Sequence, residues 1–259
     1  MAASGRLEGS VVLVTGSTTG IGAAMARRFV AEGARVLVHG LEREIGDAAV
    51  KSLGRSVALH IDDLSDAAAP ARVVAAAVAA FGRLDAVVNN AAWIVRGDIA
   101  TTDVALFDRC MAINVRAPLL LVQAALPHLE ESRGCVLNIG SINGYCGEAN
   151  QLAYSISKGA LITLSRNLAD ALGARQVRVN HMNLGWVLSE NEYKLKVSEG
   201  SPPDWHEHPP AAFAPSGRIL TPDQVAAAAV YWVSPESRPV SGTVMELEQY
   251  PVIGRNPVK

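Results

Sequence analysis

The stretch VVLVTGSTTGIG, residues 11–22, decides the fold expected for this chain. It begins as a β-branched apolar run, continues into glycines at Gly16, Gly20 and Gly22, and opens an Ala-rich helical pattern. Glycines there permit a tight turn and a close backbone approach to pyrophosphate, and the N–H groups that begin the helix attract its negative charge. We therefore expect a dinucleotide phosphate site at this turn; a plain tight turn is the alternative.

Outward from this turn, the same alternation continues along the chain. Short apolar runs, typical of strands covered on both faces, alternate with longer amphipathic patterns. The expected strands are 11–15, 35–39, 56–61, 84–89, 134–140, 177–182 and 242–248, and the expected helices are 20–32, 66–81, 103–130, 152–173 and 222–233. This repetition predicts an α/β fold with a doubly wound, Rossmann-type parallel sheet in three α/β/α layers. No composition shift divides the chain, so residues 1–259 are expected to form a single dinucleotide-binding domain.

One segment, residues 189–217, breaks the alternation. It is rich in Pro, Glu, His and Trp and shows no clear period. Its proline pairs, Pro202–Pro203 and Pro209–Pro210, disfavour helix and favour extended backbone. Because long irregular segments in α/β domains are usually functional, we expect a substrate lid here.

Composition excludes several classes of protein. Hydrophobic residues make up 49% of the 259 residues, the net charge is −2, and no basic stripe is present, so neither disorder nor a nucleic-acid partner is expected. No uninterrupted apolar run reaches about 18 residues, so no membrane span is expected. The cysteines Cys110, Cys135 and Cys146 lack metal-ligand spacing. They predict free thiols, no metal site and a cytoplasmic location.

Several motifs together resemble the short-chain dehydrogenase/reductase family. The turn has the spacing T-G-x-x-x-G-x-G, and it is followed in the family's order by NNAA (89–92), NIGS (138–141) and YSISK (154–158). The resemblance covers nearly the whole chain from residue 15 onward. It implies an NAD(P)-dependent oxidoreductase that interconverts a secondary alcohol and a ketone, assembled as a homo-oligomer, either a tetramer or a dimer.

Tyr154 and Lys158 lie four residues apart in an expected helix, so their side chains project from the same face. A free tyrosine, with a pKa of about 10, is a poor proton-transfer group near neutral pH, and a nearby cation lowers that pKa. The resemblance implies that Tyr154 is the general acid/base and that Lys158 lowers its pKa and binds the ribose. It also implies that Ser141 hydrogen-bonds the reacting oxygen and that Asn114 helps hold a water beside Lys158.

The resemblance further implies a set of cofactor contacts, in which Tyr154 and Lys158 take part again. The other residues are Gly16, Thr19, Gly20, Ile21 and Gly22 in the turn, Asp63 and Leu64 at the adenine, Asn90, and Val187 and Ser189 at the nicotinamide. Asp63, placed at the end of the third expected strand, has an alternative role as a cap for the following helix. The chain departs from the family at Ala92, where Gly is usual, and at Leu184, where Pro is usual; both departures bear on the cofactor pose.

The choice between NAD and NADP depends on the end of the second expected strand. NAD-binding chains usually carry a carboxylate there, and this chain has Gly40. Leu41 stands where many NADP-using relatives have Arg, while His39 and Arg43 are cations close enough in sequence to serve. We expect NADP or NAD, with a slight preference for NADP.

The substrate is expected to be a small molecule rich in hydroxyl groups, namely a sugar or polyol, because the candidate pocket residues are amides, carboxylates and aromatic rings. They are Trp93, Asn143, Tyr145, Glu148, Asn150, Gln151, Trp186, Glu190, Asn191, Tyr193, Trp205 and His206. Solvent-facing loop positions are the alternative for many of them. Two other functions remain open: a 3-oxoacyl-thioester reductase, and a non-catalytic dinucleotide-binding sensor.

Overall fold

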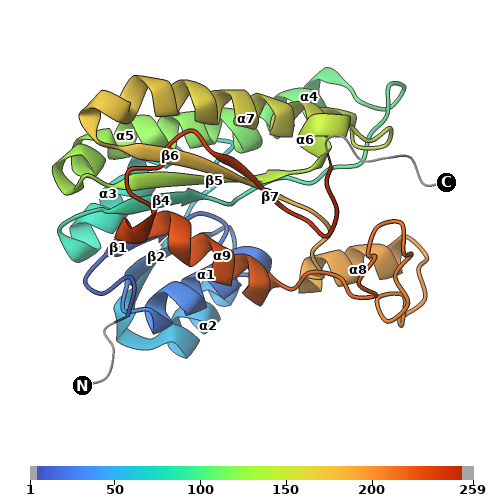
Figure 1. The fold of residues 1–259 in the computed structure, drawn as a ribbon, viewed down its shortest axis with the longest axis horizontal. Helices are drawn as coiled ribbons and strands as arrows, with labels where there is room; N and C mark the ends of the chain where they lie inside the picture. Colours follow the sequence, from blue (N-terminus) through green and yellow to red (C-terminus); the bar gives the residue numbers. More distant parts are fainter. Residues whose placement is uncertain (1–4, 253–259) are drawn as a thin grey trace.

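A computed structural model describes residues 5–252, which build one seven-stranded parallel sheet between two layers of helices (Figure 1). The strand order is β3-β2-β1-β4-β5-β6-β7. The strands are β1 (Val11–Val14), β2 (Arg35–Gly40), β3 (Val57–Ile61), β4 (Ala86–Asn89), β5 (Cys135–Ser141), β6 (Arg178–Leu184) and β7 (Val244–Leu247). Strand order reverses between β1 and β4, and ligands of such sheets bind at the carboxyl edge beside this switch point. The predicted Rossmann-type fold and all seven predicted strands are confirmed.

Apolar side chains from both faces of the sheet form two cores. One packs under α1 (Gly20–Ala31), α2 (Arg43–Leu53) and α9 (Pro222–Val233), and it contains Phe29, Val36 and Trp232. The other packs under α3 (Ala69–Phe81), α5 (Ala117–Ser132) and α7 (Leu152–Leu172), and it contains Leu13, Leu121 and Val179. Short 3-10 turns occupy Gly54–Ser56, Gly173–Arg175 and Pro235–Ser237. Because β1 and β4 are buried on both faces, their runs are apolar except for Asn89 at the end of β4.

The longest helical run is α4 (Val104–Met111), a π-helical turn (Ala112–Arg116) and α5 in succession. By length and composition alone the run Val104–Ser132 could cross a membrane, which the sequence did not suggest. Its face bearing Leu121 and Leu129 is packed in the core of the sheet, as in a core helix. Among residues 5–252 no other helix meets that test.

The structure differs most from the predictions in the segment 189–217. The prolines were expected to limit helix, yet Glu190–Ser198 forms helix α8, which ends before Pro202. Ser189 caps it, accepting a hydrogen bond from the N–H of Glu192. Figure 1 shows α8 and the loop that follows it set apart from the two helical layers. Helices α2 and α6 (Asn143–Cys146) were also missed.

Candidate active site

Four of the predicted residues come from neighbouring elements. Ser141 ends β5 and pairs with Leu184 of β6 at the carboxyl edge of the sheet. Tyr154 and Lys158 lie in the first turns of α7 and are 7% and 3% exposed. Asn114 lies in the π-helical turn and is 1% exposed. Such turns often mark functional sites because they interrupt the regular helical hydrogen-bond ladder.

The ionisation of the Tyr154–Lys158 pair differs from the prediction. Burial raises the pKa of Tyr154 to about 12, although hydrogen bonding with Ser141 acts to lower it. Burial also lowers the pKa of Lys158 to about 8. The Lys158 ammonium lies 5.5 Å from the centre of the Tyr154 ring and donates to the carbonyl of Ile139 at 2.8 Å. The predicted lowering of the phenol pKa is therefore not seen, because burial disfavours the charged phenolate more than the Ser141 hydrogen bond favours it.

Asn114 fixes the segment after β4 against α7. Its Oδ1 accepts from the Trp93 N–H at 2.8 Å, and its Nδ2 donates to the Ser157 hydroxyl at 2.9 Å. The side chain thus has protein partners on both of its polar atoms. It positions the π-helical turn close to Lys158, which lies one residue after Ser157.

The glycine-rich turn has the shape that a pyrophosphate site needs. Gly16 and Gly20 adopt left-handed backbone angles, with φ of +61° and +57°. A Cβ on Gly22 would lie 2.1 Å from the Gly16 carbonyl oxygen, so only glycine fits there. Thr19 is the N-cap residue of α1, and Ile21 lies in its first turn, partly buried. The N–H groups of this turn are therefore able to meet a phosphate.

Asn90 and His39 hold the turn from neighbouring strands. The Asn90 amide donates to the carbonyls of Thr15 and Gly16 at 2.9 and 3.0 Å. His39 Nδ1 accepts from the Gly16 N–H at 3.3 Å, so its Nε2 carries the proton and donates to the Asp62 carbonyl at 3.1 Å. Burial lowers the pKa of His39 to about 4. His39 is therefore neutral and buried, which corrects its candidacy as a cation for a 2′-phosphate.

At the adenine end, β3 ends at Ile61, the last residue of the predicted strand, so Asp63 lies two residues beyond the strand end. Asp62, not Asp63, follows the strand, and hydrogen bonds from Arg72 are the main reason that its pKa falls to about 2. Asp63 Oδ1 accepts from the Ser65 N–H at 2.8 Å in the loop before α3, whose N-cap residue is Ala68, so Asp63 does not cap that helix. Leu64 is buried beside it. Both side chains flank the edge of the sheet where the adenine was expected.

Several residues at or after the ends of strands bear on which cofactor binds and how it lies. Gly40 is the last residue of β2, as predicted, and a Cβ there would lie 2.5 Å from Thr18 Cγ2. Leu184 ends β6 and is buried, and Val187 after it forms an isolated bridge with Leu220. Ala92 is exposed. Ser189, expected at the nicotinamide, caps α8 with its hydroxyl.

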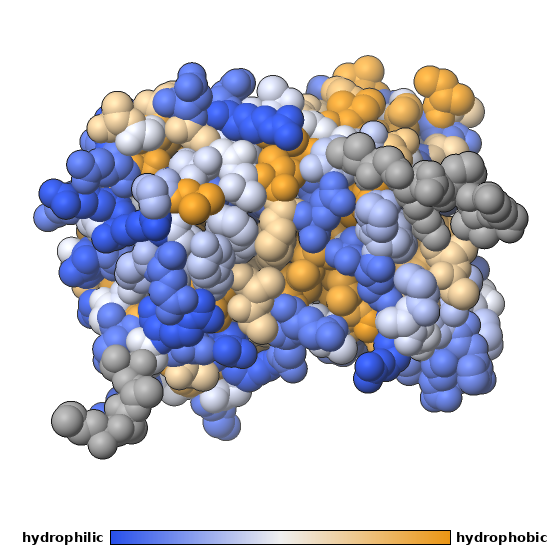
Figure 2. Space-filling view, in the orientation of Figure 1, coloured by the Kyte–Doolittle hydropathy of each residue, from blue (hydrophilic) through white to orange (hydrophobic). Residues whose placement is uncertain are grey.

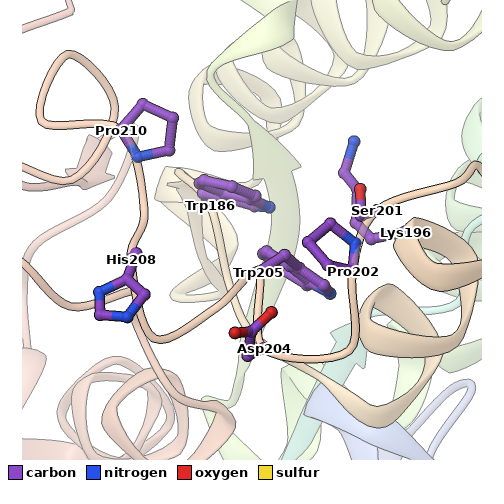
Figure 3. A pocket seen from close by; sticks show the side chains of 8 residues that line it. All are labelled: Trp186, Lys196, Ser201, Pro202, Asp204, Trp205, His208 and Pro210. Carbon is purple, nitrogen blue, oxygen red and sulfur yellow. The ribbon is translucent and has the colours of Figure 1, made fainter.

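Polar and aromatic candidates for the substrate pocket form two groups. Asn143 and Gln151 both donate to Glu148 Oε2, at 3.0 and 2.8 Å. Trp186 stacks on Trp205 with ring centres 5.2 Å apart. These two indoles line a cavity of about 560 Å³ together with Lys196, Pro202, His208 and Pro210. Figure 3 shows the two indoles lying nearly parallel. In contrast, Glu190 points to solvent and pairs with Lys194.

Three charged residues near this pocket were missed from sequence. Glu192 accepts from the Trp186 indole N–H at 2.8 Å, and Arg96 pairs with Glu199 at 2.8 Å. The spacing Ser189-x-x-Glu192 is a helix-start signal that could have placed the first of them. Nothing local in the sequence indicates the pair between Arg96 and Glu199, which are 103 positions apart.

Comparisons with known proteins find relatives over most of the chain. A family model described as enoyl-(acyl carrier protein) reductase matches residues 16–248. The chain is 32% identical to 2-(S)-hydroxypropyl-CoM dehydrogenase 3 of Xanthobacter autotrophicus, over 95% of this chain and 97% of the relative. It is 31% identical to meso-2,3-butanediol dehydrogenase of Serratia marcescens (92% of each chain) and 34% identical to L-fucose dehydrogenase of Mus musculus (90% and 85%).

A solved structure leads to the same group of proteins. The 3-ketoacyl-(acyl-carrier-protein) reductase of Brucella melitensis, complexed with NADH, superposes with a TM-score of 0.82 at 27% identity, covering 93% of this chain and 97% of that one. The family match extends over most of the chain and includes the glycine turn and the Ser141–Tyr154–Lys158 cluster. The chain belongs to the short-chain dehydrogenase/reductase family and is an oxidoreductase that acts on CH–OH groups with a nicotinamide dinucleotide.

Proposed function

We propose that the protein interconverts a secondary alcohol and a ketone of a sugar or polyol. The observation that carries this proposal is the convergence of Ser141, Tyr154 and Lys158 at the carboxyl edge of the sheet, beside a turn shaped for pyrophosphate. Open α/β sheets bind their ligands at this edge. The residues present therefore fit a dinucleotide whose reactive ring would reach Tyr154.

In the proposed mechanism, the protein positions the substrate and moves one proton. The bound nicotinamide supplies or accepts the hydride. The Tyr154 hydroxyl gives its proton to the carbonyl oxygen during reduction and takes it back during oxidation. Ser141 hydrogen-bonds the same oxygen and stabilises its developing charge. Lys158 binds the ribose hydroxyls, and Asn114 positions the turn beside it.

A hydroxyl-rich substrate is supported by the polar network of Asn143, Glu148 and Gln151. Carboxylate and amide groups at fixed positions can bond several hydroxyls, whereas an acyl chain would need an apolar wall. The names of two relatives specify a butanediol and fucose. A 3-oxoacyl-thioester reductase is the second candidate, supported by the ketoacyl reductase that shares the fold.

For the cofactor we propose a slight preference for NADP, because Gly40 offers no carboxylate against a 2′-phosphate. With His39 neutral, Arg43 is the cation that remains. Its guanidinium is exposed and lies 4.0 Å from Asp47, loosely enough held to turn toward a phosphate. The remaining proposed cofactor contacts are those of the turn, of Asp63 and Leu64, of Asn90, and of Val187 and Ser189.

A homo-oligomer, either a tetramer or a dimer, is proposed from exposed apolar side chains on one part of the surface. Ile94, Ile99, Val104 and Ile156 are all more than a third exposed. Figure 2 shows apolar surface over the region of α4 and the loop before it. Burial of these side chains against a second copy would remove them from water. A cytoplasmic location stays a prediction; Cys110, Cys135 and Cys146 are free thiols in the structure.

The test is a panel of polyols, keto-sugars and 3-oxoacyl thioesters, each assayed with NAD and NADP in both directions by the absorbance of the reduced nicotinamide. Turnover of polyols or keto-sugars supports the proposal, and turnover of thioesters alone favours the second candidate. Binding of a dinucleotide with no turnover of any alcohol or ketone would favour the non-catalytic sensor. The ratio of kcat/KM with NADP and NAD settles the cofactor preference.

A further inference from the structure

Side-chain contacts at both ends of helix α8 hold it beside the candidate active site. In its first turn, Glu192 accepts a hydrogen bond from the Trp186 indole at 2.8 Å. Just beyond its last turn, Glu199 pairs with Arg96 at 2.8 Å. Trp186 lies two residues beyond Leu184, whose strand pairs with Ser141. One carboxylate of α8 is therefore held on the Ser141 side of the site.

Arg96 is held on the other side, next to the start of α7. The neighbouring Gly97 donates its N–H to the Asn150 carbonyl and accepts from the Leu152 N–H, each at 2.9 Å. Leu152 begins the helix that carries Tyr154 two residues later. The charges of Glu192 and Arg96 both act on Tyr154: Glu192 raises the pKa of the phenol and Arg96 lowers it. Both side chains are thus close enough to the proposed acid for their charges to act on it.

Neither side chain has its polar atoms fully used by the fold. Glu192 occupies the helix position from which a carboxylate often reaches back to the N-cap N–H. That N–H, of Ser189, donates instead to the Val187 carbonyl at 2.9 Å. Arg96 Nη1 is buried and has no hydrogen-bond partner in the part of the chain that is described. A buried donor without a partner costs free energy, which an oxygen of a bound substrate would recover.

We propose that Glu192 and Arg96 recognise a second oxygen on the carbon next to the reacting one, so that the substrate is a vicinal diol or the matching α-hydroxyketone. This inference rests on the proposed alcohol–ketone interconversion. Glu192 accepts a hydrogen bond from the neighbouring hydroxyl, and Arg96 Nη1 donates to the oxygen of that hydroxyl. Together they form an acceptor and a donor, which suits a hydroxyl and suits neither a methylene nor a carboxylate.

In the oxidation, the neighbouring hydroxyl is bound but unchanged. The carbinol carbon loses a hydride to the nicotinamide ring of NAD(P)⁺, and its hydroxyl proton passes to Tyr154. The C–O bond becomes a carbonyl as these two transfers remove two electrons and two protons. The second hydroxyl keeps its proton, which stays in the hydrogen bond to Glu192. Reduction of the α-hydroxyketone reverses every step.

The test compares 2,3-butanediol with 2-butanol, which lacks only the second hydroxyl, in the wild-type protein and in Glu192→Gln. The variant keeps an amide oxygen that can accept from Trp186, so α8 stays anchored. The matched control is Glu207→Gln, which removes the same charge from an exposed position of the same segment. We expect kcat/KM to favour the diol at least tenfold in the wild type and in Glu207→Gln. In Glu192→Gln this ratio should fall several-fold, because the diol loses a hydrogen-bond partner that 2-butanol never had.

A second readout separates recognition from mere anchoring of the helix. Loss of the Glu192 charge should lower the apparent pKa in the pH profile of kcat/KM, whereas Glu207→Gln should leave it in place. An unchanged diol-to-alcohol ratio in Glu192→Gln would overturn the inference. Equal rates on the two alcohols in the wild type would overturn the inference and leave the proposed function standing. Turnover of no alcohol or ketone by the wild type would overturn both.

Discussion

The cofactor side and the substrate side of this site are held in place by different kinds of contact. On the cofactor side, the backbone of the glycine turn is hydrogen-bonded by His39, which is buried in β2, and by half-buried Asn90, which follows β4. On the substrate side, α8 is held by side chains of which Arg96 and Glu199 are 30% and 32% exposed. Buried backbone contacts fix a geometry, whereas partly exposed ion pairs hold a segment weakly. We infer a rigid cofactor site beside a substrate site that can open.

The largest effect, a loss of catalysis without a loss of cofactor binding, is expected from Tyr154→Phe. The phenol hydroxyl carries the proton that is transferred in the proposed mechanism. Its removal leaves the glycine turn unchanged. We expect kcat/KM to fall by roughly 10³-fold or more while the Kd of the dinucleotide changes less than threefold. Steady-state kinetics and fluorescence titration with the reduced dinucleotide measure the two quantities. Activity within about tenfold of wild type would remove Tyr154 from the role of acid.

The cofactor side was largely predictable because its signals are local. The turn 15–22, the strands around it and the Tyr154–Lys158 spacing follow from periodicity and turn chemistry within a few residues. The substrate side was not, because its contacts join residues far apart in sequence. The nine residues of α8 were hidden in a proline-rich segment whose average pattern shows no period. The role of His39 was misassigned because sequence does not show whether an imidazole is buried.

A large effect on stability is expected from Lys158→Met. In the folded protein burial holds the pKa of Lys158 at about 8, against 10.5 for a free lysine. Below pH 8 the buried charge costs up to about 3 kcal/mol. Between pH 8 and 10.5 the unfolded wild type binds more protons than the folded one, so its stability rises with pH in that range. The variant should therefore have the higher Tm at pH 7, and the gap should close as the pH rises to 10.5.

Lys158→Met also bears on both sides of the site, because the buried charge of Lys158 lies where the cofactor side meets the substrate side. Tyr154 titrates in both proteins, so its contribution cancels in the difference. Activity and dinucleotide affinity should both fall, since the ribose loses its proposed partner. A variant less stable than wild type at pH 7 would mean that the hydrogen bond from Lys158 to Ile139, at 2.8 Å, outweighs the burial of the charge.

A moderate effect on the cofactor side is expected from two substitutions of His39. Asparagine places an acceptor near the position of Nδ1, whereas glutamine places a donor near that of Nε2. If the bond to the Gly16 N–H shapes the phosphate turn, His39→Asn should keep the dinucleotide Kd within about threefold of wild type. His39→Gln should weaken it by roughly tenfold, with kcat at saturation little changed. The reverse order would assign the effect to the Asp62 contact.

The smallest effect is expected on the substrate side, from Glu199→Gln. Its ion pair with Arg96 is partly exposed, and such pairs contribute at most about 1 kcal/mol. We expect the substrate KM to rise two- to fivefold and amide exchange in α8 to quicken, with the dinucleotide Kd unchanged. Lys194→Gln, which breaks the exposed pair with Glu190 on the same helix, should change neither quantity. In the wild type, exchange across 189–217 should slow when dinucleotide and substrate bind together, because closure of the segment removes it from water. Equal and strong protection in the free and bound states would instead make this segment as rigid as the glycine turn, and the contrast between the two sides would disappear.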